Sequence, residues 1–199
     1  DTAVVAYAVD PTTHKRFIID VHKMTRPTPA QIRQLIFDWT SLYQPSEWMV
    51  EKNAFQSFLT QDEGIRQHLS TRGVILREHH TGGNKWDAGF GVASMSTLFG
   101  TKQLDNKHHR DNLIHLPSDQ TENVKSLIEQ LVTWSPTTKG KTDMVMALWF
   151  CEIRAREILN RGQYQAHHLK NPFLTRAERG KRMVVNIDQL LEEQQRTFI

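Results

Sequence analysis

The sequence predicts an α/β fold in which a mixed sheet carries helices on both faces. Two runs rich in β-forming residues, 2–9 and 15–21, flank a turn sequence at 10–14 and so predict an antiparallel hairpin. Beyond the hairpin, helical patterns alternate with short apolar strands, as expected where helices connect neighbouring strands. With 199 residues, of which 38% are hydrophobic, the chain is long enough for one substantial core.

The first helix is expected to begin after Thr28. This threonine can act as the N-cap, Pro29 takes the first helical position and Gln31 the third, a pattern that resembles a capping box. Pro45 ends the helix. Apolar residues at i, i+3, i+4 and i+7 predict a face that packs in the core, namely Ile32, Leu35, Ile36 and Trp39.

Two short strands follow, at 48–50 and 74–76, and a helix that ends near Gly73 joins them. Glu51 lies directly after the first of these strands. In open α/β sheets, ligands bind at the carboxyl ends of strands, so Glu51 is a candidate for chemistry. The alternative is a strand-end glutamate exposed to solvent.

Asp143 is the second candidate, because it begins a strongly apolar helix expected over 144–153. A carboxylate in a first helical turn interacts favourably with the helix dipole, by ~0.3–1 kcal/mol, and this alone would explain the residue. Alternatively, the rigid start of the helix presents Asp143 toward the end of the sheet that carries Glu51. Two such carboxylates supply the oxygen ligands that Mg²⁺ or Mn²⁺ prefers, and two ions about 3.5–4 Å apart can promote phosphodiester cleavage.

Other motifs do not support a site. Gly140-Lys141-Thr142 lacks the glycine that a phosphate-binding loop needs five residues earlier, where Ser135 stands, so no ATP site is expected. Cys151 is the single cysteine of the sequence, so a disulfide framework and a cysteine-based zinc site are excluded. It lies in an apolar run. Three histidine pairs lack the i, i+4 spacing of a zinc-binding helix and are expected in loops or at the surface: His79-His80, His108-His109 and His167-His168.

Net charge and hydropathy give weak evidence on the partner and on the location of the protein. The net charge of +3 favours a polyanionic partner only weakly. No apolar run approaches the ~20 residues of a membrane span, and no signal-peptide pattern opens the sequence. An intracellular protein that does not contact a membrane is therefore expected.

The order of the elements fits a ribonuclease H-like fold. In that fold, a three-stranded antiparallel meander precedes the strands that helices connect. Only two meander strands are visible here, so the first strand is expected to be absent from the sequence.

Three segments resemble, in the same order, the nuclease domain of tailed-phage terminase large subunits: Trp48 to Gln56, Thr81 to Asp87 and Gly140 to Phe150. The resemblance extends from Asp1 to about Arg156. It implies a ribonuclease H-like endonuclease that uses Mg²⁺ or Mn²⁺, with two ions, to cut concatemeric double-stranded DNA during viral genome packaging. Glu51 and Asp143 are similar to the second and last acids of that family's metal site.

The first acid of the family pattern is missing. Family members place one aspartate at the end of the opening strand and another just before the next strand, and Asp1 resembles the second of these. Asp1 is therefore expected to be an auxiliary acid near the metal site. Asp10 is a weaker substitute for the missing aspartate, since it belongs to the hairpin turn. The missing acid leaves a non-catalytic role as an alternative.

Basic and aromatic residues provide candidates for DNA contacts. Lys85 lies in the second matching segment, and the others lie beside it or in a basic loop. Side chains at these positions would contact the DNA backbone, and solvated surface charge is the alternative. The candidates are Lys85, Trp86, Lys102, Lys107 and Arg110.

Two parts of the chain are expected, a nuclease domain over 1–160 and a C-terminal basic tail over 161–199. The resemblance implies double-stranded DNA, the portal protein and the small terminase subunit as partners, an ATPase domain N-terminal to this chain, and a location in the host cytoplasm. The tail is a candidate for docking onto the portal, and a simple charged tail is the alternative. Two other functions stay open: another ribonuclease H-like nuclease such as a junction resolvase, and a non-catalytic DNA-binding or portal-docking fragment.

Overall fold

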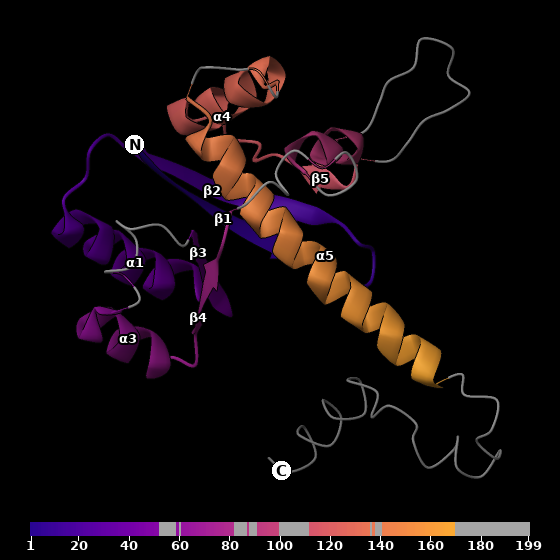
Figure 1. The fold of residues 1–199 in the computed structure, drawn as a ribbon, viewed down its shortest axis with the longest axis horizontal. Coiled ribbons are helices and arrows are strands. Elements are labelled where there is room, and N and C mark those ends of the chain that lie inside the picture. Colours follow the sequence, from indigo (N-terminus) through magenta and orange to yellow (C-terminus); the bar gives the residue numbers. More distant parts are fainter. Residues whose placement is uncertain are drawn as a thin grey trace, which may run out of the picture. The chain divides into compact units, whose positions relative to one another are not determined.

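The computed structural model describes residues 1–51, 59, 61–81, 87, 91–99, 112–135, 137 and 141–169 (Figure 1). The chain divides into two units, Asp1–Ile158 and Leu159–Ile199, and the elements below belong to the first, apart from the end of the last helix. In chain order they are β1 (Thr2–Val9), β2 (Arg16–Met24), α1 (Pro29–Tyr43), β3 (Glu47–Glu51), α3 (Glu63–Ser70), β4 (Ile75–His79), the 3-10 helix η2 (Val92–Leu98), β5 (Ile114–His115), α4 (Glu122–Thr133) and α5 (Asp143–Leu169).

β1 and β2 form the expected antiparallel hairpin (Figure 1). The register places Thr2 opposite Met24 at the open end. In the turn, the Asp10 carboxylate accepts hydrogen bonds from the backbone N–H of Thr12 (2.8 Å) and from the hydroxyl of Thr13 (2.5 Å). The structure therefore confirms the hairpin and gives Asp10 a role in its turn.

The strands form two sheets within the described residues, whereas a single mixed sheet was expected. β5 pairs in parallel with β2 at Arg16 and Phe17, so the first sheet is mixed and has the order β1-β2-β5. β3 and β4 form a second, parallel sheet in which Glu51 lies opposite His79. A parallel pair needs a crossover connection, and α3 lies in the segment between these two strands. The mixed α/β class is confirmed.

Helix α1 begins at the predicted cap. The backbone N–H of Gln31 donates to the Thr28 hydroxyl, and the backbone N–H of Thr28 donates to the Gln31 side-chain oxygen at 2.8 Å, which completes the capping box. After α3, Gly73 has φ +68°, a left-handed conformation that favours glycine, and this confirms the predicted stop near Gly73. α1 and α3 share a buried apolar cluster with the second sheet: Ile32, Ile36, Leu59, Ile65, Leu69 and Val74.

Alternate residues of β3 face opposite sides of the second sheet. Trp48 and Val50 pack with the α1 and α3 cluster, whereas Met49 packs against the core around α5. Helices therefore lie on both faces of this sheet, as predicted.

α5 contributes more buried residues to the larger core than any other element does. The helix was expected over 144–153 and extends to Leu169, because the residues after 153 include many strong helix formers such as leucine, glutamate, arginine and alanine. Although α5 has 27 residues, no helix in the described part of the chain has the apolar length needed to cross a membrane. Its buried residues in this core are Met144, Val145, Leu148, Trp149 and Phe150.

Candidate metal and nucleic-acid site

β1 and α5 run in the same direction. At the amino end of β1, the Lys141 ammonium group, just before α5, lies 2.8 Å from an Asp1 carboxylate oxygen. Farther along both elements, the Tyr7 hydroxyl donates a hydrogen bond to the Glu152 carboxylate at 3.0 Å. The start of β1 therefore lies beside the start of α5.

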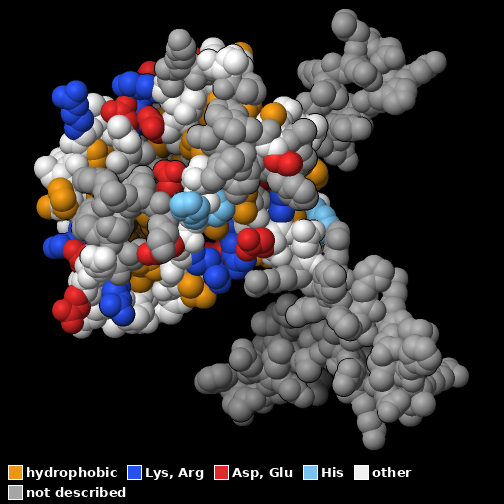
Figure 2. Space-filling model, viewed as in Figure 1, with side chains coloured by type: hydrophobic (Ala, Val, Ile, Leu, Met, Phe, Trp, Pro, Cys, Tyr) orange, Lys and Arg blue, Asp and Glu red, His pale blue; other side chains and the backbone are white. Residues whose placement is uncertain are grey.

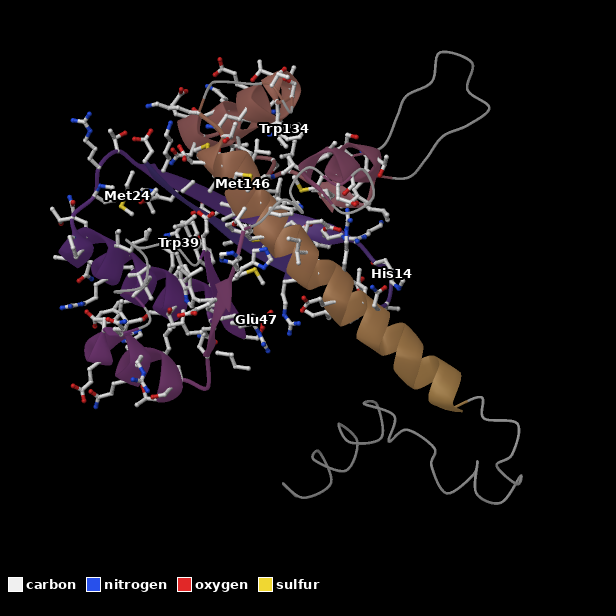
Figure 3. All side chains as sticks on the ribbon, viewed as in Figure 1. His14, Met24, Trp39, Glu47, Trp134 and Met146 are labelled. Atoms are coloured by element: carbon white, nitrogen blue, oxygen red, sulfur yellow. The ribbon has the colours of Figure 1, made fainter. Side chains whose placement is uncertain are left out.

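β3 and β4 run in the opposite direction to α5. Glu47, at the start of β3, contacts the guanidinium of Arg154 on α5, and its side chain extends toward that helix (Figure 3). At the far ends of the strands, the ring of His79 lies 5.1 Å from that of Phe150, and Glu51 lies opposite His79. The carboxyl ends of both strands are therefore directed toward the first half of α5.

These two directions place the elements that carry the three predicted acids beside the first half of α5. Glu51 lies two residues after Met49 and so shares the face of β3 that packs against the α5 core. Asp143 is the first residue of α5 and lies about 10 Å along the helix from Phe150, at 1.5 Å per residue. The strand ends that carry Asp1 and Glu51 thus both lie beside the half of α5 that Asp143 begins.

The acids do not complete a metal site among the residues that the structure describes. No group of three or more histidine, cysteine, aspartate or glutamate side chains that could hold a metal ion occurs in that part of the chain. The oxygen donors of Glu51 and Asp143 suit Mg²⁺ or Mn²⁺ in chemistry. A further ligand from outside the described residues, or from DNA or water, would be needed to hold an ion.

Asp143 is half-buried in the first turn of α5. That turn starts well anchored, because the backbone N–H of Met146 donates to the carbonyl of Thr142 at 2.9 Å, and the N–H of Met144 donates to the Gln130 side chain at 3.1 Å. The negative charge of the Asp143 carboxylate interacts favourably with the helix dipole, whether or not Asp143 also binds a metal ion.

His79 lies opposite Glu51 in the second sheet, a neighbour that the sequence did not indicate. A loop or surface position was expected, and this is wrong, because His79 ends β4 and is half-buried against the rings of Trp149 and Phe150. Burial lowers the pKa of its imidazole, and the charges of Glu157 and Glu51 oppose that shift only in part. His79 therefore favours the neutral form, and it packs beside the candidate acid as an aromatic ring.

A buried charge network fixes α5 to the first sheet. The Glu152 side chain is fully buried and accepts hydrogen bonds from the Arg16 guanidinium at 3.1 and 3.2 Å, from Arg156 at 2.9 Å and from the Tyr7 hydroxyl. Arg156 also donates to the Ser94 hydroxyl at 3.0 Å, which connects η2 to the network. Burial raises the pKa of the Tyr7 hydroxyl, and the charge of Glu152 raises it further. The network is structural, since it positions the helix that carries Asp143.

Cys151 is unsuited to nucleophilic chemistry. Its thiol lies 3.8 Å from the carbonyl oxygen of Val5. Burial and the charge of Glu152 raise the pKa of the thiol to about 12, so it stays protonated at neutral pH.

Glu47 joins β3, β4 and α5 through two arginines. Its carboxylate contacts Arg154 of α5 and lies 2.5 Å from the guanidinium of Arg77 of β4. Burial raises the pKa of Glu47, but hydrogen bonds and charges from Arg154 and Arg77 outweigh burial and hold the pKa below its usual value of 4.5. The folded state therefore favours the ionised carboxylate.

We expect the contribution of Glu47 to stability to be lost at acid pH. A group with a lowered folded-state pKa stabilises the protein fully above its unfolded-state pKa, and the contribution disappears as the pH falls through the folded-state value. Glu47→Gln should therefore be less stable than the native protein at neutral pH, and the difference should shrink as the pH falls below about 4.5. Urea unfolding over a pH series measures this, with the exposed Glu129→Gln as control. A difference that is constant with pH would contradict the assignment.

The predicted DNA contacts lie outside the described residues. These are Lys85, Trp86, Lys102, Lys107 and Arg110. On the face drawn in Figure 2, the lysine and arginine side chains that the structure describes are interspersed with aspartate and glutamate. The distribution of charged side chains on that face therefore does not indicate where DNA would bind.

Comparisons of the chain with protein-family models, with curated proteins and with solved structures find no match. The function is therefore argued from the residues and from the geometry above.

Proposed function

We propose that this chain carries the nuclease part of a viral DNA-packaging terminase, a divalent-metal-dependent endonuclease that cuts double-stranded DNA. One observation carries the proposal: the start of β1 lies beside the start of α5, and the ends of β3 and β4 lie beside Phe150 in the same half of that helix, although these segments are distant in sequence. Glu51 and Asp143, chosen for their places at a strand end and a helix start and also similar to terminase acids, belong to these segments. Glu51 lies at the carboxyl end of β3, and ligands bind outside the carboxyl ends of strands in open α/β folds.

A ribonuclease H-like fold is part of the same proposal. β1 lies at the edge of its sheet, and β3 has β4 as its partner in a separate sheet, within the described residues. Both strands pack against the α5 core. A further strand between β1 and β3 would join the two sheets into one and would supply the missing acid of the family pattern.

Each acid has a distinct role in the proposed reaction. Glu51 and Asp143 would hold Mg²⁺ or Mn²⁺, which when bound lowers the pKa of water and neutralises charge on the phosphate. Asp1 acts as an auxiliary acid at the same end of α5. The buried core under Asp143, built on Leu148 and Trp149, keeps the helix start in place.

Metal dependence tests the proposal. Supercoiled plasmid incubated with the protein and Mn²⁺ or Mg²⁺ should be nicked or linearised, and EDTA should stop the reaction, because the proposed nucleophile is water activated by the metal ion and the Cys151 thiol stays protonated at neutral pH. Agarose gel electrophoresis measures the products. Cutting that persists in EDTA would contradict the proposal.

A non-catalytic DNA-binding or portal-docking fragment is the second candidate. The absence of a three-ligand metal group within the described residues favours it. Plasmid binding without cutting in either metal would support it, whereas selective cutting of four-way junctions would favour a junction resolvase. For the terminase, the proposed partners are double-stranded DNA, the portal protein, the small terminase subunit and an N-terminal ATPase domain, in the host cytoplasm.

A further inference from the structure

Two lysines from distant segments converge on one carboxylate beside the candidate acids. The ammonium nitrogen of Lys141 lies 2.8 Å from Oδ2 of Asp1, and that of Lys23 lies 3.6 Å from the same atom. Lys23 belongs to β2, and Lys141 lies 118 positions later, just before α5. Because both contact one oxygen, they are close enough to contact a single phosphate group.

The position of Lys23 is fixed by the sheet. Lys23 follows Val21 by two residues, so both project from the same face of β2, and Val21 is buried in the core around α5. The Lys23 side chain is only 21% exposed, whereas that of Lys141 is 65% exposed. The pair therefore combines a lysine held against the protein with one that can reach into solvent.

Electrostatics explain why an anion lies between them. Two ammonium groups at this separation repel each other unless a negative charge is placed between them. In the protein alone, Asp1 supplies that charge, and its carboxylate is only 9% exposed. A phosphodiester carries the same single charge and presents further oxygens, so it can take the same place between the lysines.

We propose that Lys23 and Lys141 form a phosphate-binding pair that holds one backbone phosphate of DNA at the start of α5, which Asp143 begins, and that Asp1 occupies the phosphate position when DNA is absent. The proposal rests on the proposed function for its ligand, DNA. The two lysines would attract the DNA backbone. The acids cannot do this, since their negative charges repel the backbone before a metal ion binds.

DNA binding in EDTA tests the pair separately from cleavage. A short fluorescein-labelled duplex is titrated with the protein, and anisotropy gives the affinity at several salt concentrations. Lys23→Ala and Lys141→Ala should each weaken binding by about fivefold to tenfold, and the double variant should lower the slope of log affinity against log salt by about 0.9, the value for one shared phosphate. Asp1→Asn should strengthen binding, because it frees both lysines.

A matched control removes the same charge elsewhere. Lys125 is exposed on α4 and pairs with Glu122 at 2.8 Å, so Lys125→Ala should bind the duplex like the native protein. Thermal unfolding of each variant checks that the fold is retained, and the exposed Lys141 provides a variant that should fold normally even if Lys23→Ala does not.

The outcomes separate this proposal from the proposed nuclease. Three results would overturn the phosphate pair. Lys141→Ala and Lys125→Ala could lose the same affinity for the duplex, Lys141→Ala could bind it as tightly as the native protein, or the native protein could fail to bind it. Binding that depends on the two lysines, without plasmid cutting in Mn²⁺ or Mg²⁺, would support the pair and reject only the nuclease.

Discussion

If Glu51 and Asp143 hold the proposed metal ion, Glu51→Gln and Asp143→Asn should each reduce plasmid cutting in Mn²⁺ by about 100-fold or more, because loss of a metal ligand removes several kcal/mol of charge stabilisation in the transition state. Both substitutions keep the size of the side chain and remove its charge. Both acids are half-buried at element ends, so the fold should tolerate the change. Initial rates of plasmid nicking, measured on gels at a fixed protein concentration, give the ratio to the native protein.

The two variants also distinguish a metal ligand from a capping residue. If Asp143 serves only the helix dipole, Asp143→Asn should lose ~0.3–1 kcal/mol of stability and keep its cutting rate. The exposed Asp119→Asn and Glu129→Gln provide matched controls that remove the same charge elsewhere, and both should cut like the native protein. Native rates in Glu51→Gln would remove Glu51 from the site.

Glu152→Ala should destabilise the protein by about 3–5 kcal/mol, because it leaves a buried arginine without its counter-charge. Arg16 is 5% exposed and depends on Glu152 for two hydrogen bonds, and the Tyr7 hydroxyl loses its acceptor as well. Equilibrium unfolding in urea, with the slope checked for two-state behaviour, measures the loss.

The control for this prediction is the exposed Glu129→Ala on α4, which should change the free energy of unfolding by less than about 0.5 kcal/mol. Glu152→Gln keeps the side-chain volume and should still be destabilised, since the charge that Arg16 and Arg156 require is gone. A loss in Glu152→Ala no larger than that of the control would show that Arg16 finds another partner or water.

Local signals in the sequence predicted the strand and the helix that carry the two candidate acids. An apolar strand that ends at Glu51 and an apolar helix that begins at Asp143 are short-range patterns, and the structure has both. The Thr28 capping box is another local signal of this kind. Side-chain alternation then gave the face of β3 that carries Glu51, once the partner of that face was known.

Contacts between distant residues could not be predicted in the same way. Glu152 looks like a single polar residue in an apolar helix, and nothing in its neighbourhood indicates Arg16, 136 residues earlier. Lys23 and Lys141 both contact Asp1 because of the directions in which β1, β2 and α5 run. The hydrophobic periodicity of the sequence carries no information about these directions. His79 was misassigned because the sequence pattern ended the strand before it, whereas pairing with Glu51 extends β4 to that residue.

The late position of α5 in the chain has a consequence for biosynthesis. β1 and β2 leave the ribosome long before Glu152, so the apolar face of the hairpin stays uncovered until the more than one hundred residues between β2 and α5 have been made. Such long-range closure slows folding compared with helical bundles of similar size. Asp143 comes beside the first sheet only when α5 packs there, so a nascent or truncated chain that ends before α5 would carry Glu51 without Asp143 and should lack the proposed cutting activity.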